Sequence, residues 1–413
     1  MKKNSPAKVL FASLAGTTIE FFDFYIYANA AVLIFPSLFF AASTSSTEML
    51  QSLATFSVAF FARPLGSAFF GHFGDRVGRK TTLVAALLTM GVSTVAIGLL
   101  PTYQSIGIFA PILLVICRFG QGFGLGGEWG GAVLLAVENA PPEKKAWYGM
   151  FPQLGAPIGL MLSGGIFLYL SSTMTEVDFF DYGWRIPFLL SSVLILIGLY
   201  VRLTILETPE FLKNQKNKKT LAVPFFEVFK NYRTPMILGT FIALATFVLF
   251  YLMTVYIASW AITDLNINRE DFLGDQIESV LFFAVFIPIS AVLADRYGRK
   301  LILIVASLGI ILFGLTLGSL LNISILFTLS VGMALMGFTY GPLGTILSEL
   351  YPTNVRYTGA SLSFNFAGIV GASFAPFIAL WLSTNFGLHF VGYYLALAAI
   401  ISLIATHLSS KAK

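Results

Sequence analysis

The sequence predicts an all-α membrane protein whose twelve transmembrane helices form two pseudo-symmetric six-helix bundles. Three observations support this prediction. The chain is 57% hydrophobic and only 11% charged, whereas soluble domains are about 25% charged. Its apolar segments are long enough to cross about 30 Å of hydrocarbon at about 1.5 Å per residue. In addition, a charged turn occurs twice, about half a chain apart.

The apolar segments form two groups of six. Those of the first group cover residues 10–40, 51–72, 81–100, 106–137, 147–170 and 185–205. Those of the second group cover residues 235–262, 273–294, 301–320, 323–350, 361–383 and 388–408. A charged stretch separates the groups. We therefore expect an N-terminal bundle over 1–205, a cytoplasmic linker over 206–233 and a C-terminal bundle over 234–413.

The basic residues indicate the orientation of the chain. Most of the 25 lysines and arginines lie on one side of the predicted helices, which also holds both termini. The opposite connections are mainly acidic, and Arg269 is their one clear basic exception. Because loops rich in lysine and arginine stay in the cytoplasm, both termini are predicted to be cytoplasmic. The protein is expected to be a multi-pass protein of the inner membrane.

Two motif pairs indicate that the halves are duplicates. The turn DRVGRK begins at Asp75 and recurs as DRYGRK at Asp295. The segments that begin at Glu138 and Glu349 form a second pair at the same relative position. Charged side chains at these turns can pair with Glu138 or with the C-terminal end of a facing helix, and can hold the cytoplasmic side closed. The predicted cytoplasmic gate residues are Asp75, Arg76, Arg79, Glu128, Glu138, Asp295, Arg299, Glu349 and Arg356.

The fourth apolar segment contains an unusual stretch, RFGQGFGLGGEWGG, from Arg118 to Gly131. Its glycines would destabilise a soluble helix by about 0.5–1 kcal/mol each. In a membrane, small residues let neighbouring helix backbones approach closely. The stretch also matches G-x-G-x-x-G, but no strand precedes it, so a dinucleotide site is not expected. We interpret the stretch as one tightly packed transmembrane helix that carries Arg118 deep in the bilayer.

Four ionisable side chains are predicted to lie near the bilayer midplane. Glu20 and Asp23 share one face of the first helix, because they are three residues apart. Counting along each helix places them, with Arg63 and Arg118, about 15–20 Å deep. Ionisable residues within transmembrane segments mark substrate and proton pathways by default. The second half offers only polar candidates at this depth: Tyr251, Tyr256, Tyr340 and Asn365.

The motifs resemble those of a known family. The doubled D-R-x-G-R-K turn is similar to the signature of the major facilitator superfamily. The first-helix motif GTTIEFFDF from Gly16, the segment Arg63-Pro-Leu-Gly and the GGEWGGA run resemble its metabolite:proton symporter branch. This resemblance implies alternating access between two six-helix bundles. It also implies a substrate such as an organic acid, a shikimate-type compound or a zwitterion such as proline or betaine.

Together these observations predict a secondary transporter that imports a small carboxylate-bearing or zwitterionic metabolite by proton symport. Asp23 is predicted to take up the proton, with Glu20 as its partner or substitute. Arg118 and Arg63 are predicted to bind the carboxylate, and Tyr27 and Gln121 to line the site. Without substrate, we expect an ion pair between Asp23 and Arg118.

Other functions fit the sequence less well. The run Gly155-Ala-Pro-Ile-Gly159 keeps a proton-coupled antiporter or exporter as the alternative. A channel would not need duplicated gate motifs. An enzyme would need a nucleophile or a metal cluster, and the three histidines are too dispersed for a metal site. The expected partners are therefore a small substrate, protons and the lipid bilayer, without nucleic acid, and no cofactor is expected beyond the proton gradient.

Overall fold

The computed structural model describes residues 6–40, 44–77, 79–204, 224–352 and 355–409. This part of the chain is almost entirely helical and contains no strand, which confirms the predicted all-α class. Within it, 12 helical segments are long and apolar enough to cross a membrane. The predicted number of transmembrane helices is therefore confirmed.

The spans of the first half are α1 (Pro6–Leu33), α3 (Ser45–Val77), α4 (Arg79–Leu99), α6 (Phe109–Gly126) with α7 (Trp129–Glu138), α8 (Lys145–Thr173) and α10 (Arg185–Thr204). Those of the second half are α13 (Arg233–Tyr251) with η3 (Leu252–Tyr256) and α14 (Ile257–Thr263), α15 (Arg269–Tyr297), α16 (Arg299–Ile323), α17 (Ile325–Glu349), α18 (Arg356–Gly368) with η4 (Ile369–Ser373) and α19 (Ala375–Phe386), and α20 (Leu388–Leu408). Short helices lie between the spans: α2 (Phe35–Phe39), α5 (Tyr103–Ile106), η1 (Pro142–Lys144), α9 (Glu176–Asp178), η2 (Phe179–Gly183) and α12 (Pro224–Asn231).

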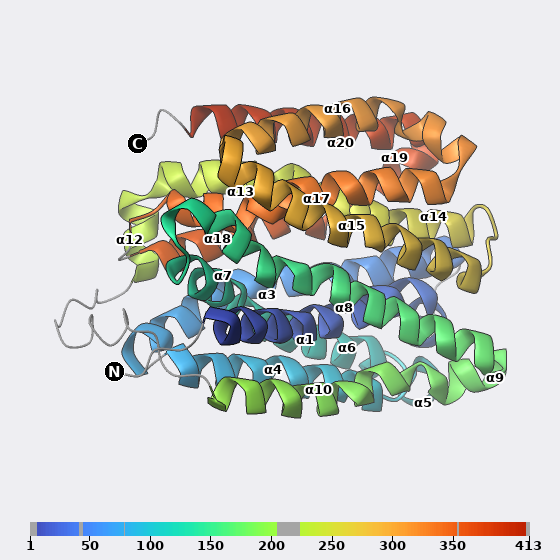
Figure 1. The fold of residues 1–413 in the computed structure, drawn as a ribbon. Helices are drawn as coiled ribbons and strands as arrows, with labels where there is room; N and C mark the ends of the chain where they lie inside the picture. The colour runs from blue at the N-terminus through green and yellow to red at the C-terminus, as the bar shows by residue number, and fades with distance from the viewer. Residues whose placement is uncertain (1–5, 41–43, 78, 205–223, 353–354, 410–413) are drawn as a thin grey trace.

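The long helices lie side by side along one direction. Figure 1 shows α1, α4, α6 and α10 of the first half on one side of the molecule and α13, α16, α17 and α20 of the second half on the other. Helices α8 and α15 pack against each other where the two halves meet. The first residues of α1 and the last residues of α20 lie at the same end of the molecule as α12 (Figure 1).

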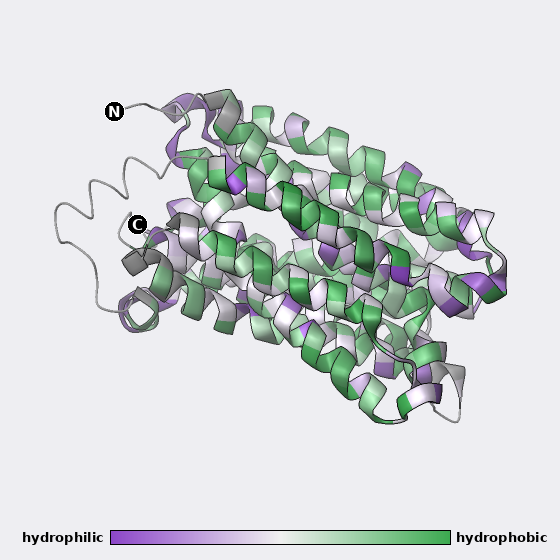
Figure 2. Ribbon diagram, turned by 90° about the horizontal axis from the view of Figure 1, so that it is seen from below, coloured by the Kyte–Doolittle hydropathy of each residue, from purple (hydrophilic) through white to green (hydrophobic). Residues whose placement is uncertain are grey.

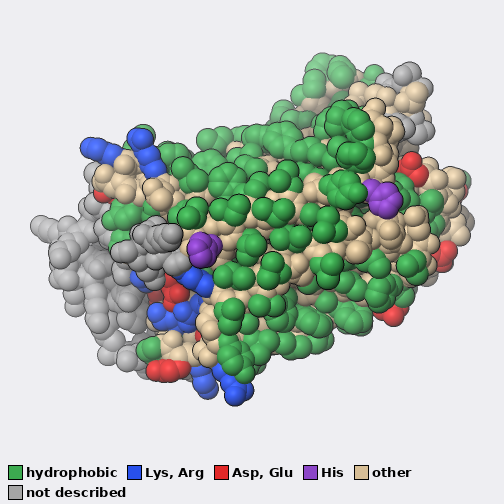
Figure 3. All heavy atoms as spheres, turned by 90° about the horizontal axis from the view of Figure 1, so that it is seen from above, with side chains coloured by type: hydrophobic (Ala, Val, Ile, Leu, Met, Phe, Trp, Pro, Cys, Tyr) green, Lys and Arg blue, Asp and Glu red, His purple; other side chains and the backbone are tan. Residues whose placement is uncertain are grey.

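Charge is concentrated at the two ends of the molecule. We call the end that holds α12, Lys145 and Arg299 the basic end, and the end that holds Glu176 and Asp264 the acidic end. Figure 2 shows hydrophobic residues along the helices between these ends, with hydrophilic residues at the ends. On the face in Figure 3, hydrophobic side chains form a band, with lysine and arginine mainly at one end and acids mainly at the other. An apolar belt between charged ends is the expected surface of a protein surrounded by lipid.

The fourth span is not the single continuous helix that the sequence predicted. Helix α6 ends at Gly126, and α7 starts after Glu128. At the break, the amides of Gly127 and Glu128 donate to carbonyls three residues earlier, not four residues earlier as in an α-helix. These hydrogen bonds are 3.1 and 3.2 Å long. The prediction was wrong here because successive glycines allow a tightened turn that apolar periodicity does not reveal. Two further spans, in the second half, contain the π-helical segments η3 and η4.

Part of the predicted linker is helical. Residues 205–223 lie outside the described part of the chain, but α12 follows them and packs against α3, α13 and α18. Its Val228 is fully buried in a small apolar cluster with Tyr351, Val355 and Leu362. This helix therefore contacts both halves at the basic end.

Candidate functional site

Close packing of α3 on α6 sets the position of Arg63. A Cβ atom at Gly66 would overlap the carbonyl of Phe123, and a Cβ atom at Gly126 would overlap the carbonyl of Arg63 itself. Gly122 packs in the same way against α3. The glycine-rich stretch thus lets two backbones touch, as the sequence predicted. The second half repeats this arrangement, because Gly341 of α17 packs against the backbone of α15.

A small cavity lies between the two halves, near the middle of the spans. Its volume is about 20 Å³, which is enough for about one water molecule. Helices α1, α3 and α8 of the first half and α13, α17 and α18 of the second contribute to its wall. The lining residues are Phe21, Tyr25, Arg63, Ala156, Thr246, Phe247, Phe250, Tyr251, Met336, Tyr340 and Phe364. We call this the central cavity.

Arg63 is the one charged residue in that lining. Its side chain is only 3% exposed, and its guanidinium lies 5.0 Å from the ring centre of Phe24 and 5.4 Å from that of Phe60. The Nε of Arg63 has no hydrogen-bond partner among the described residues. A buried guanidinium with a free N–H group can bind a carboxylate strongly. Of the predicted substrate-binding residues, Arg63 is the one that lines this cavity, and its role in binding stays a prediction.

Arg118 lies elsewhere, inside the first half. Its guanidinium packs over the rings of Tyr27 at 4.0 Å and Phe24 at 4.3 Å. One terminal nitrogen donates to Gln121, and Nε donates to the carbonyl of Phe56 at 3.4 Å. Arg118 does not line the central cavity in this structure. The two arginines that the sequence grouped together therefore have different surroundings.

Gln121 and Tyr27 connect helices of the first half rather than line the central cavity. The Gln121 amide donates to the carbonyl of Asp23 at 2.7 Å and to the hydroxyl of Thr94 at 2.9 Å. The Tyr27 hydroxyl donates to Thr55 at 2.9 Å. Gln121 therefore joins α1 to α4 and connects the backbone of Asp23 to Arg118.

Asp23 is fully buried, and neither of its carboxyl oxygens has a hydrogen-bond partner among the described residues. Thr94 and Ser191 are polar neighbours of this carboxyl, and Glu128 is an acidic one. No ion pair joins Asp23 to Arg118, although both side chains are described. The expected pair is therefore absent from this structure, because the guanidinium is held by aromatic rings and Gln121.

Glu128 has a partner that the sequence analysis missed. Its carboxylate accepts two hydrogen bonds from Arg202 of α10, at 3.0 and 2.9 Å. Glu128 is 1% exposed, and such two-pronged pairs are the strongest kind of ion pair. The signal was a single arginine in the apolar run of the sixth span, at its predicted cytoplasmic end. Glu20, the predicted partner of Asp23, is buried in the same region.

Charged contacts join the halves at the basic end. The Asp295 carboxylate accepts hydrogen bonds from the amides of Ala146 and Trp147, both at 2.9 Å. It therefore binds the N-terminal end of α8, where the helix dipole favours negative charge. This partner differs from the helix C-terminus or Glu138 that the sequence predicts for such a turn. The side chains of Asp75, Arg76 and Arg79 lie outside the described residues.

The other predicted gate residues at this end also make contacts. Arg299 donates to Glu349 at 2.7 and 2.9 Å and pairs with Asp295 at 3.4 Å. Lys145 of the first half lies 3.9 Å from Glu349. Arg356 donates to the carbonyl of Tyr351 at 3.2 Å. Charges from both halves therefore form one network around Asp295 and Glu349.

Replacing Asp295 with asparagine should weaken closure at the basic end. The loss of a charge at a helix N-terminus costs about 0.3–2 kcal/mol. We would measure maleimide labelling of Ser361→Cys, which is buried against Gly130, in a Cys117→Ala background. Labelling should be faster with Asp295→Asn than without it. Asp264→Asn at the acidic end is the control, and equal rates in all three proteins would contradict a closing role for Asp295.

Aromatic and polar contacts extend this closure toward the central cavity. The rings of Trp129 and Phe364 stack at 3.7 Å. The Tyr357 hydroxyl donates to the carbonyl of Gly127 at 2.6 Å, and the Gln153 amide donates to the carbonyl of Tyr340 at 3.0 Å. These contacts all join the two halves.

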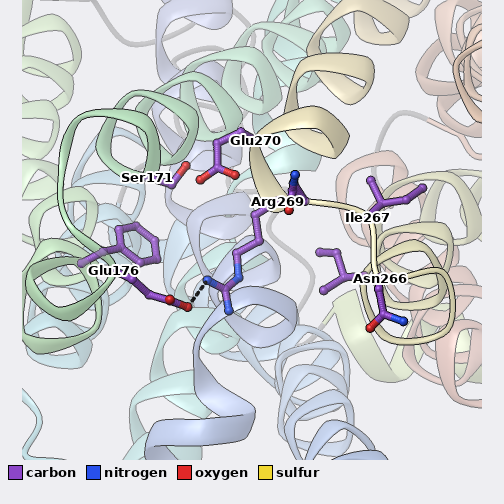
Figure 4. Close-up of a pocket in the computed structure, with 9 residues that line it drawn as sticks. Ser171, Glu176, Asn266, Ile267, Arg269 and Glu270 are labelled. Atoms are coloured by element: carbon purple, nitrogen blue, oxygen red, sulfur yellow. Dashed lines mark ion pairs between the residues drawn. The ribbon is translucent and has the colours of Figure 1, made fainter.

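The halves also meet at the acidic end. Arg269 of α15 pairs with Glu176 of α9 at 3.6 Å, and its guanidinium lies 4.8 Å from the ring centre of Phe180. Figure 4 shows this pair across a surface pocket of about 390 Å³. Deeper in, the Ser57 hydroxyl donates to the carbonyl of Ser373. Because the halves are joined at both ends, this structure represents an occluded form of the protein.

Comparison with known proteins identifies the family. The model of the Major Facilitator Superfamily matches residues 14–356. The chain belongs to this superfamily. The inner membrane metabolite transport protein YhjE of Escherichia coli (strain K12) is 54% identical, over 99% of this chain and 95% of that protein. The shikimate transporter of the same organism is 36% identical, over 94% of this chain and 91% of its own length.

A solved structure has the same fold. The proton:xylose symporter XylE bound to 6-bromo-6-deoxy-D-glucose matches with a TM-score of 0.79, over 98% of this chain and 95% of that one. At 16% sequence identity, this likeness shows the fold alone. The predicted membership of the superfamily, the twelve-helix fold and the inner-membrane location are confirmed. This member of the major facilitator superfamily is a metabolite transporter and not an enzyme.

Proposed function

We propose that this transporter imports a small carboxylate-bearing or zwitterionic metabolite together with protons by alternating access. The observation that supports it best is Arg63, a buried cation with a free N–H group in a cavity shared by both halves. Contacts at both ends separate this cavity from the two sides. Such a site can bind an anionic group only when one end opens.

The lining of the central cavity favours a small and partly apolar substrate. Phe21, Phe247, Phe250 and Phe364 supply apolar surface, while the hydroxyls of Tyr25, Tyr251 and Tyr340 supply polar groups. The cavity of about 20 Å³ is too small for any metabolite, so these aromatic side chains must move apart when substrate enters. A relative that is a shikimate transporter is consistent with a carboxylate as the group that Arg63 binds.

Asp23 remains our proposal for the proton-coupling acid. Its carboxyl forms no ion pair and no hydrogen bond within the part of the chain that the structure describes. A charged group in that position costs at least about 2.5 kcal/mol, so a protonated Asp23 favours occlusion. Gln121 connects the backbone of Asp23 to Arg118. A shift of α1 would therefore change the contacts of both Asp23 and Arg118. In this proposal the proton gradient drives transport, and no cofactor is needed.

The test is transport by Asp23→Asn in proteoliposomes. A substrate would first be identified by screening monocarboxylates, dicarboxylates, shikimate, proline and betaine with and without a proton gradient. Asparagine mimics the protonated acid, so the variant should still exchange labelled substrate across the membrane. It should fail to accumulate substrate when a gradient is imposed. If it accumulates substrate as well as the parent does, Asp23 is not the coupling acid.

The alternative function, a proton-coupled antiporter or exporter, has less support from the structure. The glycines of the fifth-span run pack closely on α1, since Gly155 contacts Thr17 and Gly159 contacts the backbone of Phe22. Helix packing therefore accounts for these glycines. The same proteoliposomes decide the direction of coupling, because an antiporter would expel preloaded substrate when protons enter.

A further inference from the structure

A second group of buried charges lies in the first half, toward the basic end from the central cavity. Glu128 is held by Arg202 through two hydrogen bonds. A terminal nitrogen of Arg202 lies 3.4 Å from the position of a Cβ atom built on Gly16. Glu20 follows Gly16 by one helical turn, and side chains four residues apart share a helix face. The Glu128–Arg202 pair therefore lies beside Glu20.

Glu20 is buried without a hydrogen bond in the described part of the chain. It is 1% exposed, and both carboxyl oxygens lack a hydrogen-bond partner among the described residues. The acid that acts on it is Glu128, which also acts on Asp23. Among the described residues, Glu20 forms no ion pair with Arg63 or Arg202. The titratable and charged groups that act on Glu20 or feel its charge are Tyr25, Arg63, Glu128, Arg202 and Tyr340.

Glu20 and Glu128 are two adjacent acids with one hydrogen-bonded arginine beside them. Arg202 already uses two N–H groups on Glu128, so Glu128 can remain ionised. A second bare carboxylate beside it, without donors and out of water, would be costly. Two adjacent buried carboxyl groups avoid this cost when one of them keeps a proton. The missing donors at Glu20 indicate which of the two holds it.

We propose that Glu20 and Glu128 form a proton-binding site distinct from Asp23, in which Glu20 holds the proton and Arg202 neutralises Glu128. This site also belongs to the closed basic end. Glu128 directly precedes Trp129, which stacks on Phe364 of the second half at 3.7 Å. The preceding residue, Gly127, accepts the hydrogen bond of Tyr357 at 2.6 Å.

Loss of the proton should therefore favour opening at the basic end. An ionised Glu20 repels Glu128 and competes with it for Arg202, which moves α7 relative to α1. Because α7 carries the contacts of Trp129 and Gly127 with the second half, the closure weakens. By linkage, opening of this end releases the proton and a higher pH promotes opening. The inference rests on the fold and the basic-end closure, not on the coupling role of Asp23.

The first experiment measures the proton itself and needs no substrate. The purified protein, in vesicles of phosphatidylethanolamine and phosphatidylglycerol, would be examined by infrared spectroscopy for the carbonyl band of protonated carboxylic acids. Glu20→Gln should remove one component of this band. Glu128→Gln should remove the same component, because Glu20 then ionises and pairs with Arg202. A band unchanged in both variants would show that Glu20 is ionised, which overturns the proposal.

The second experiment measures the closure. The chain has one cysteine, so Cys117→Ala allows nitroxide labels at Asn139→Cys and Leu408→Cys, at the basic ends of α7 and α20. Electron–electron distance measurements should show a longer-distance population that grows with pH. Glu20→Gln should abolish this growth, whereas Asp23→Asn should keep it. The proposal would be contradicted if the longer-distance population grew with pH in Glu20→Gln as it does in the parent. It would also be contradicted if this growth were lost only in Asp23→Asn.

Discussion

Replacing Gly126 with alanine should strongly reduce the amount of folded protein. The new methyl group would overlap the carbonyl of Arg63, and a backbone atom cannot rotate away as a side chain can. Overpacking of this kind costs about 1–3 kcal/mol. It would also push α3 from α6 and move Arg63 out of the central cavity. Thermal unfolding in detergent should occur at a lower temperature, and transport should fall in parallel.

The matched control is an alanine at another helical glycine. Gly165 of α8 and Gly274 of α15 have no heavy atom within 4 Å of an added Cβ atom. Alanine there should leave stability unchanged or slightly higher, because alanine is the better helix former. If Gly126→Ala unfolds at the same temperature as Gly165→Ala, the close approach of α3 and α6 is not as the structure shows it.

Replacing Arg63 with lysine should lower the affinity for substrate at least tenfold, or about 1.4 kcal/mol. Lysine keeps the charge but loses the planar pair of donors. It also loses the packing of the guanidinium over Phe24 and Phe60. Binding would be measured by the concentration dependence of counterflow, with the substrate that the proteoliposome screen identifies.

Arg118→Lys is the informative comparison. The sequence analysis expected both arginines to bind the carboxylate, whereas Arg118 packs on Tyr27 and binds Gln121 within the first half. We therefore expect this variant to lower the unfolding temperature more than the affinity. A large loss of affinity in Arg118→Lys, with Arg63→Lys unaffected, would place the substrate site inside the first half instead.

Much of the fold could be predicted because lipid imposes strict rules on sequence. A span needs about 20 apolar residues, so the twelve helices could be predicted from the lengths and positions of the apolar segments. The motif pairs at Asp75 and Asp295 indicated the duplication, and the glycines around Gly126 indicated close packing. Counting residues along the second span also gave an expected depth for Arg63, and in the structure this residue lines the central cavity between the halves.

The sequence could not show which residues share a site. Counting gives depth but not the direction of a side chain around the bundle, so Arg63 and Arg118 seemed equivalent. The chain contains 41 phenylalanines, and nothing in the sequence marks Phe247 or Phe250 as cavity lining. The partner of Glu128 was missed because Arg202 is 74 residues away.

The sequence by itself thus determined the transmembrane class, the number of spans, the repeat and the membership of the superfamily. These properties follow from local composition and from motifs within short segments. Only the tertiary structure decided that Arg63 faces both halves, that Asp23 and Arg118 are not paired, and that Asp295 binds the start of α8. Each of these depends on how helices distant in sequence rotate and cross. That rotation is set by close contacts between helices, such as the packing of Gly126 against the carbonyl of Arg63. Such contacts act between segments of the chain rather than within them.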